Sequence, residues 1–128
     1  MGLAVAAASA CGLFGPTSDD FVIAVDSIGG PLAVSAAVAF DQRLYGMVGP
    51  NGCYSLREVR MTRSPASAEV TVVGRRRNGA VCTQEPVYLG GVAVTIVPPV
   101  MDPFTLRVRQ PDGSTLTKTI RVVSQQAP

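Results

Sequence analysis

Apolar residues in this chain alternate with small or polar ones over short runs, and most runs end at a glycine or a proline. The strongest case is the run 32–40, with apolar side chains at every second position from Leu32 to Phe40. Runs at 104–109 and 116–122 repeat the pattern on either side of a Pro-Asp-Gly-Ser turn. A repeat of two places every second side chain on one face of a strand. The alternation therefore predicts half-buried β-strands joined by tight turns.

Two positions interrupt the simple pattern of the predicted strands, and shorter runs predict further strands. These runs lie at 21–25, 44–48, 54–61, 70–72, 81–87 and 92–96. The alternation slips near Glu58, which predicts a β-bulge there. Lys118 falls in phase with the apolar set of the last run, so we expect it at a sheet edge or strand end where its ammonium reaches water. From residue 21 onward no segment has the sustained 3.6-residue repeat of a helix.

The number and spacing of these runs predict the fold class and the domain limits. About seven or eight short strands, with a turn signal roughly every 8–12 residues, are typical of an all-β, immunoglobulin-like β-sandwich of antiparallel strands. A chain of 128 residues fits one domain, and its 47% apolar content can form a core. We expect a signal remnant and flexible tether at 1–20, the sandwich at 21–124 and a short tail at 125–128.

The N-terminal residues differ in composition from the rest of the chain. Residues 1–10 are mostly small and apolar, and residues 12–20 are rich in Gly, Pro, Ser and Asp. A short apolar stretch that closes in small residues is typical of the end of a secretory signal. The segment 8–11 (Ala-Ser-Ala-Cys) resembles the lipobox of bacterial lipoproteins, which implies cleavage before Cys11 and lipid on its sulfur. The alternative is an Ala-rich strand or helix with a buried Cys11.

The three cysteines bear on the compartment and on a disulfide. An odd number is awkward for a secreted domain, but if Cys11 carries lipid, Cys53 and Cys82 remain as a pair, and each follows a turn signal. A zinc site or a redox pair would favour CxxC spacing or histidine ligands, and the chain offers neither. We therefore predict a structural disulfide between Cys53 and Cys82 in an extracytoplasmic protein, in the periplasm or on the outer cell surface.

A family resemblance rests on the stretch 47–82 and on the C-terminal hairpin. The stretch contains GPNGCYSLREV, then EVTVVG, then the second cysteine, and the hairpin reads FTLRVRQPDGSTLTKTIRV. This arrangement resembles immunoglobulin-like modules of bacterial envelope lipoproteins, and the match covers residues 21–123 in outline. The resemblance implies the fold, a disulfide about thirty residues wide and an envelope location. Because such modules are mostly uncharacterised, it implies no activity.

The residues needed for the common kinds of catalysis are missing or badly placed. The chain has no histidine, so a nucleophile of the Ser-His-Asp or Cys-His kind has no base that titrates near neutral pH. Asp19 and Asp20 lie in the expected tether and Asp112 in a turn, so a pair of catalytic carboxylates is not indicated. Gly-rich phosphate loops are absent, and the dispersed methionines suit core packing better than metal binding. We predict no catalytic residues, cofactor or metal.

Arginine supplies almost all of the positive charge and suggests one binding surface. A Gly-Arg-Arg-Arg-Asn-Gly turn and the polar positions of the last two strands could meet in space, with a further basic stretch at Arg57, Arg60 and Arg63. Such a surface would bind anions. The alternative is a set of solvated arginines, since the net charge is only +2. The candidate anion-binding residues are Arg75, Arg76, Arg77, Arg107, Arg109 and Arg121.

These observations lead to an expected function and to two alternatives. We expect a non-catalytic, secreted or lipid-anchored envelope module that binds a protein or an anionic polymer and meets the membrane only through lipid on Cys11. Nucleic acid is not an expected partner, because few aromatic residues could stack on bases. One alternative is a carrier of a small apolar ligand, with a pocket lined by Phe40, Phe104 or Tyr88. The other is a hydrolase that uses carboxylates alone.

Overall fold

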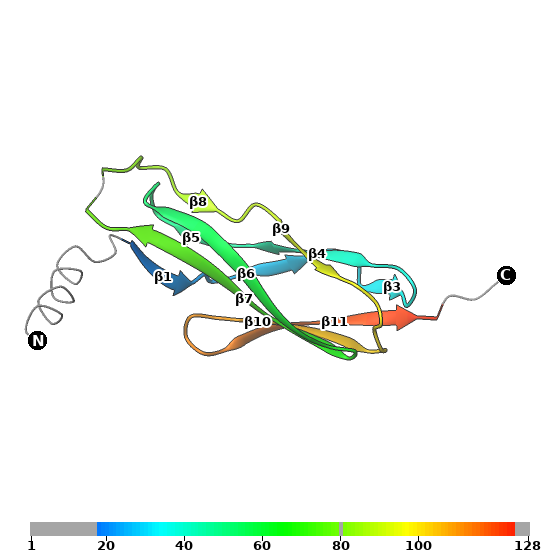
Figure 1. Ribbon diagram of the computed structural model, residues 1–128. Helices are drawn as coiled ribbons and strands as arrows, with labels where there is room; N and C mark the ends of the chain where they lie inside the picture. The colour runs from blue at the N-terminus through cyan, green and yellow to red at the C-terminus, as the bar shows by residue number, and fades with distance from the viewer. Residues whose placement is uncertain (1–17, 80, 125–128) are drawn as a thin grey trace, which may run out of the picture.

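The computed structural model describes residues 18–79 and 81–124, and this part of the chain contains β-strands and no helix (Figure 1). The prediction of an all-β fold is confirmed. There are more strands than expected, because the runs 32–40 and 44–48 are each divided between two strands and residues 27–29 form a further one. The strands are β1 (Ser18–Val22), β2 (Ser27–Gly29), β3 (Ala33–Ser35), β4 (Phe40–Tyr45), β5 (Met47–Gly49), β6 (Tyr54–Ser64), β7 (Ser67–Arg77), β8 (Val87–Tyr88), β9 (Val92–Ile96), β10 (Phe104–Arg109) and β11 (Thr115–Val123).

The strands form one large sheet and two smaller ones. In the large sheet, β7 pairs along one edge with β6, and along the other with β10 at residues 67–70 and with β1 at residues 73–77. The sheet continues from β10 through β11 to β3. The order β2-β4-β9 makes the second sheet, and β5 pairs with β8. Figure 1 shows β8 and β9 on the side of the molecule opposite β10 and β11.

Two of the strand pairs are parallel, so the expectation of purely antiparallel strands is wrong. The pairs are β7 with β10 and β3 with β11. Parallel neighbours need a crossover connection, which a tight turn cannot provide. The chain between β7 and β10 passes through β8 and β9 in the smaller sheets before it returns. The sequence pattern shows where strands occur but carries no sign of this detour.

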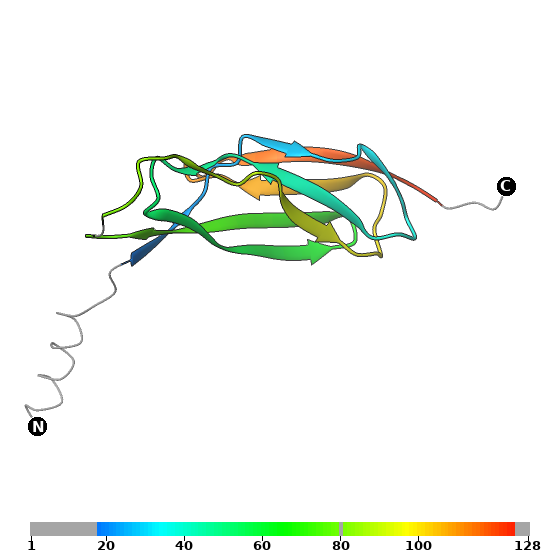
Figure 2. The same cartoon turned by 90° about the horizontal axis from the view of Figure 1, so that it is seen from above.

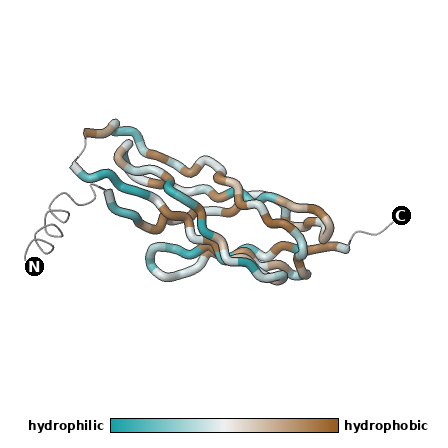
Figure 3. Tube along the Cα trace, viewed as in Figure 1, coloured by the Kyte–Doolittle hydropathy of each residue, from teal (hydrophilic) through white to brown (hydrophobic). Residues whose placement is uncertain are grey.

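Alternate residues of the facing strands form one hydrophobic core between the sheets. On β10, Phe104, Leu106 and Val108 are completely buried, and their neighbours face outward. Leu44 of β4 and Ile96 of β9 reach the same core from the second sheet. Figure 3 shows the corresponding alternation of hydrophobic and hydrophilic segments along the chain. The repeat of two therefore predicted correctly which side of the C-terminal hairpin is buried.

The run 32–40, the strongest strand signal in the sequence, is not one strand. Residues 33–35 form β3 in the large sheet, a turn follows, and β4 begins at Phe40 in the second sheet. The Ser35 hydroxyl accepts a hydrogen bond from the Ala37 backbone N–H (3.2 Å), which favours the turn. Leu32 and Val38 are 68% and 56% exposed. The alternation continued across a turn because several of its members are alanine or valine, which are tolerated at the surface.

Other boundaries also differ from the prediction. Residues 27–29, which lie between two predicted strands, form β2. Most of the expected strand 81–87 is irregular, and only Val87 belongs to β8. Strand β1 begins at Ser18, so Asp19 and Asp20 belong to the sheet and not to a tether. The predicted bulge is confirmed, because the register between β6 and β7 shifts between Leu56 and Glu58.

Candidate functional site

The predicted disulfide joins the start of β6 to the segment after β7. Cys53 and Cys82 are bonded, with their Cα atoms 5.3 Å apart. Backbone hydrogen bonds surround the bridge: the Gly52 N–H donates to the Thr83 carbonyl, and the Arg77 N–H donates to the Cys53 carbonyl, both at 2.9 Å. The disulfide thus closes the open end of the β6–β7 hairpin, which is a position suited to a structural cross-link. Cys11, the candidate lipidation site, lies outside the described residues.

The arginine run 75–77 is divided between the two faces of β7. Arg75 and Arg77 face outward opposite Asp20 and Ser18 of β1. Arg76 points to the other face, where its guanidinium lies 5.8 Å from the centre of the Tyr54 ring. Alternation along a strand makes this separation unavoidable for three consecutive residues. The run therefore cannot act as a single basic patch.

Part of the charge in this region is neutralised within the protein. The Arg75 Nε lies 3.6 Å from the Asp20 Oδ1, and the Arg57 Nη1 lies 2.7 Å from the Asp20 Oδ2. The Arg60 Nε contacts the Glu58 Oε2 on the same face of β6. Exposed pairs of this kind contribute little to stability, ~0.2–1 kcal/mol each. Their main consequence here is that Arg57 and Arg75 already have an anionic partner.

Arg63 has a structural position near the end of β6. Its guanidinium lies 5.1 Å from the centre of the buried Phe104 ring. One Nη donates hydrogen bonds to the carbonyls of Val97 (2.6 Å) and Pro99 (3.0 Å). The side chain thereby ties the β9–β10 connection to β6 and lines a shallow surface hollow with Ser64, Pro65 and Pro99. Arg63 is therefore occupied by contacts within the fold.

Arg107 and Arg109 lie together on the outer face of the large sheet. They alternate on β10 with the buried Leu106 and Val108, so both guanidinium groups project to solvent. Arg107 stands between Glu69 of β7 and Thr117 of β11 in the register of the sheet. The Arg109 Nη1 lies 4.0 Å from the Glu69 Oε1. Outward threonines lie around the pair on β10 itself, on the neighbouring strands β7 and β11, and further away on β6: Thr105, Thr71, Thr115, Thr117, Thr119 and Thr62.

The six candidate anion-binding arginines therefore do not form one cluster. Arg75 lies six residues along β7 from the level of Arg107, which is roughly 20 Å at 3.3 Å per residue. Arg121 lies four residues along β11 from the same level, roughly 13 Å away, at the end that pairs with β3. Arg75 and Arg77 are also neighbours on the outer face, but the Asp20 carboxylate lies 3.6 Å from Arg75. The second neighbouring pair is Arg107 and Arg109. We call this pair, with the threonines around it, the β10 arginine face.

The carboxylates are mostly used as hydrogen-bond acceptors within the fold. Asp41 accepts from the Thr95 hydroxyl (2.6 Å), Asp102 from the Val122 N–H (2.7 Å) and Asp19 from the Asn78 amide (2.9 Å). The Ser114 hydroxyl and backbone N–H lower the pKa of Asp112 below its ordinary value of 3.8. A catalytic acid needs a raised pKa to hold its proton near neutral pH. The arrangement does not favour the hydrolase alternative.

The three aromatic residues considered for a carrier pocket do not share one. Phe40 and Phe104 pack edge to face, with ring centres 6.2 Å apart, and Phe104 is completely buried. Tyr88, in contrast, is 64% exposed on β8. The space between the sheets at Phe104 is thus filled by side chains. This packing does not favour the carrier alternative.

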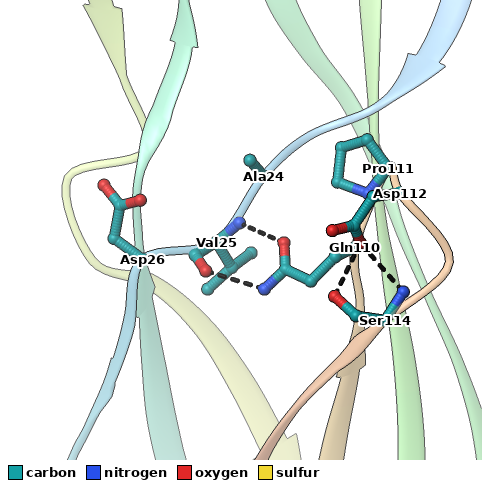
Figure 4. Close-up of a pocket in the computed structure, with 7 residues that line it drawn as sticks. All are labelled: Ala24, Val25, Asp26, Gln110, Pro111, Asp112 and Ser114. Carbon is teal, nitrogen blue, oxygen red and sulfur yellow. Dashed lines mark hydrogen bonds between the residues drawn. The ribbon is translucent and has the colours of Figure 1, made fainter.

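A second surface hollow lies where the chain crosses from β1 to β2. Its lining includes Val25, Asp26, Gln110 and Asp112 (Figure 4). The Gln110 amide binds both backbone groups of Val25: Oε1 accepts from the N–H (3.0 Å) and Nε2 donates to the carbonyl (2.8 Å). Most polar atoms in the hollow are therefore paired with each other. The hollow is explained by the crossing of the chain and needs no ligand.

Comparison with known proteins found no family model, no curated protein and no solved structure that matches this chain. Within the described ranges, no helix is long and apolar enough to span a membrane. No group of three or more cysteine and acidic side chains in this part of the chain is placed to hold a metal ion. The β10 arginine face is therefore judged on its own geometry.

The sequence reasoning missed the structural roles of two glutamines, Gln42 and Gln110. Gln42 of β4 is completely buried, and its Nε2 donates to the Pro31 carbonyl (2.9 Å). The Lys118 ammonium donates to the Gln42 Oε1 (2.5 Å) and to the Gly30 carbonyl (3.0 Å). Lys118 was expected at a sheet edge or strand end with its ammonium in water, but it lies within β11 and its ammonium is bound by these two protein acceptors. Nothing marked Gln42 or Gln110, because single glutamines beside strands are common at surfaces.

Proposed function

We propose that this chain is a non-catalytic extracytoplasmic module that binds an anionic polymer through the β10 arginine face. The observation that carries the proposal is the pair Arg107 and Arg109, held side by side on a rigid strand with both guanidinium groups in solvent. The Arg109 Nη1 forms a long ion pair with the Glu69 Oε1 at 4.0 Å, and both side chains are exposed, so an external anion can compete for the guanidinium. Both guanidinium groups thus remain available to an external anion.

The geometry of the face suits a repeating anion. Residues two apart on a strand are separated by about 6.6 Å, so Arg107 and Arg109 offer two fork-shaped donors at that interval. Guanidinium groups bind carboxylate, sulfate and phosphate through paired hydrogen bonds. Threonine hydroxyls on the flanking strands can donate to further oxygens. A flat face with charges at a fixed spacing is better suited to an extended polymer than to a compact ligand.

The fold and the location are parts of the same proposal. Two observations support an immunoglobulin-like sandwich. The sheets enclose one core, and the N-terminal segment leaves the large sheet after β1 and joins the second sheet as β2. The disulfide is compatible with an oxidising compartment, since such bonds are rare in the cytosol. Lipid on Cys11 would anchor the module at an envelope membrane. The absence of histidine supports a role without catalysis.

Binding to heparin, a sulfated polysaccharide, tests the proposal. The variant Arg107→Gln/Arg109→Gln is compared by calorimetry with Arg75→Gln/Arg77→Gln, which removes the same charge from another part of the sheet. We expect the first variant to bind at least about tenfold more weakly. The second variant should bind about as well as the unmodified protein. Equal losses in both variants, or no heparin binding by the unmodified chain at low salt, would overturn the proposal.

A further inference from the structure

Strand β6 has a long edge that no other described strand covers. It spans Tyr54–Ser64 and pairs only with β7 among residues 18–79 and 81–124. Figure 2 shows it at one border of the large sheet, with β11 towards the opposite border. An uncovered edge presents unpaired N–H and C=O groups to any strand that can lie beside it.

The direction of the backbone groups on this edge follows from printed bonds on β7. The carbonyls of Ala66 and Val72 accept from Thr105 (3.0 Å) and Ile23 (2.8 Å), so even-numbered residues of this segment point away from β6. Odd-numbered residues therefore point towards β6, as the Arg77 N–H does. The register places odd residues of β7 opposite even residues of β6 from Glu58 to Ser64. Since direction alternates along a strand, Val59, Met61 and Arg63 present their backbone groups to the free edge.

Both ends of the free edge are limited by local structure. The bulge between Leu56 and Glu58 ends regular pairing on one side. On the other side, the Arg63 guanidinium holds the segment that contains Val97 and Pro99 close to the strand. The regular and accessible part of the edge is thus centred near Val59 and Met61. Val59 is partly buried and Met61 is 40% exposed, so apolar surface lies beside the open backbone groups.

The charges on β6 select one way to pair two copies of the edge. Two copies of β6 can pair antiparallel with the same face of each sheet on the same side. The two-fold axis of such a pair can pass at Val59, Arg60 or Met61, so that this residue lies opposite its equivalent in the other copy. Centring on Arg60 brings two like charges together, which is unfavourable. Centring on Met61 places Val59 against Arg63, whose side chain is already committed to the β9–β10 connection. Centring on Val59 places Glu58 of each copy opposite Arg60 of the other. Glu58 and Arg60 already contact each other within each copy, and their side chains are 39% and 63% exposed, so they can exchange or share this contact as two opposite-charge pairs between copies.

The same register satisfies the hydrogen-bonding pattern. Val59 of each copy would exchange N–H to C=O bonds with its equivalent, because its backbone groups face the free edge. Glu58 and Arg60 would then form the non-hydrogen-bonded pairs, in which Cα atoms approach to about 4.5 Å and side chains are closest. The two-fold axis runs perpendicular to the sheet, so each copy uses the same surface. The outer faces of both copies lie on one side.

We propose that two copies of this chain associate edge to edge through β6, antiparallel about Val59, with reciprocal Glu58–Arg60 pairs. The large sheets then become one continuous sheet, and the two β10 arginine faces lie on the same side of it. The pairing rests on β6 alone and stands whether or not the β10 arginine face binds a polymer. Because only a few residues of each strand take part, the dimer should be weak and visible only at high protein concentration.

Sedimentation equilibrium from about 10 µM to about 1 mM protein tests this pairing. The variants Glu58→Arg and Arg60→Glu each place like charges opposite one another, and both should dimerise at least about tenfold more weakly. They change the net charge in opposite directions, so a general charge effect would strengthen one and weaken the other. The double variant Glu58→Arg/Arg60→Glu restores both opposite-charge pairs and should regain dimerisation.

Three outcomes would overturn the pairing. These are a monomer at all concentrations, single variants that dimerise as the unmodified protein does, and a double variant that stays monomeric. Hydrogen exchange gives a second measurement. The amides of Val59 and Met61 should exchange more slowly as the protein concentration rises, and should not do so in Glu58→Arg.

Discussion

At the scale of single residues, Gln110 replaces a missing strand neighbour for Val25. Ile23 hydrogen-bonds to β7 of the large sheet, and Asp26 bonds to Tyr45 of the second sheet. Val25, between them, has no backbone partner in either sheet, and the Gln110 amide supplies both a donor and an acceptor. Because buried backbone groups are costly to leave unpaired, the Gln110 side chain allows the chain to pass from the large sheet to the second sheet at Val25.

We predict that Gln110→Ala destabilises the fold by ~1–3 kcal/mol, because the N–H and C=O of Val25 lose their partners. Gln110→Glu should also destabilise the fold, because the carboxylate can accept from the Val25 N–H but its second oxygen repels the Val25 carbonyl. Urea unfolding measures both variants. Gln84→Ala, at an exposed loop position, is the control and should change stability by less than about 0.5 kcal/mol. A Gln110→Ala variant as stable as this control would show that the crossing does not need the amide.

Lys118 leads to a prediction about pH. Burial lowers its pKa below the ordinary value of 10.5. Between the two values the unfolded chain binds more protons than the folded chain, so this residue makes stability rise with pH in that range. Below the folded pKa both states are protonated, and the contribution no longer changes with pH. Lys118 is the only lysine in the chain.

The expected result is that Lys118→Gln removes this rise. Urea unfolding is measured at intervals from about pH 8 to about pH 11. The free energy of unfolding of the unmodified protein should increase relative to that of Lys118→Gln as the pH rises. The comparison cancels the contribution of groups common to both. A constant difference over the whole range would show that the ammonium is not desolvated in the fold.

At the scale of elements, a small residue on β7 allows β1 to pack closely. A Cβ at Gly74 would lie 2.6 Å from the Phe21 Cζ and 2.9 Å from the Ile23 Cγ1. The Phe21 ring also packs edge to face on Tyr54, with ring centres 5.7 Å apart. The glycine therefore determines how β1 and β6 meet over β7.

We expect Gly74→Ala to destabilise the fold by ~1–3 kcal/mol, because the Phe21 ring has to move within packed surroundings. Thermal and urea unfolding measure the loss. Thr71→Ala, on the outer face of the same strand, is the matched control and should have a small effect. If Gly74→Ala unfolds like the unmodified protein, the ring has room that the packing does not suggest.

At the scale of the whole molecule, the disulfide closes a long loop. Cys53 and Cys82 are separated by 29 residues and enclose the β6–β7 hairpin. On the chain-entropy model, a loop of this length contributes about 3.5 kcal/mol by restricting the unfolded chain. A small all-β domain with total stability of ~5–15 kcal/mol depends strongly on such a contribution.

The variant Cys53→Ser/Cys82→Ser should therefore lose about 3.5 kcal/mol of stability while keeping its strand content. Urea unfolding monitored by circular dichroism measures both properties. Treating the unmodified protein with a reductant should shift its unfolding midpoint towards that of the variant, and should leave the variant unchanged. An equal midpoint for oxidised and reduced protein would contradict the structural role of the bridge.

The local pattern of the sequence was sufficient for most strands, for the buried faces, for the C-terminal hairpin and for the bulge, because these depend on alternation between neighbouring residues. It did not predict β2 and wrongly predicted a strand over most of 81–87. The disulfide pair followed from the number of cysteines once Cys11 was set aside. The pattern also failed at residues 32–40, where an alternating run continues across a turn into another sheet.

The tertiary structure alone decided which strands are neighbours and which surfaces are available. Arg75, Arg76 and Arg77 are adjacent in the chain but lie on opposite faces, whereas Arg109 and Glu69 are distant in the chain and lie 4.0 Å apart. The parallel pairing of β7 with β10 and the uncovered edge of β6 have no local signature. Both depend on contacts between segments far apart in the chain, which a pattern with a period of two cannot encode.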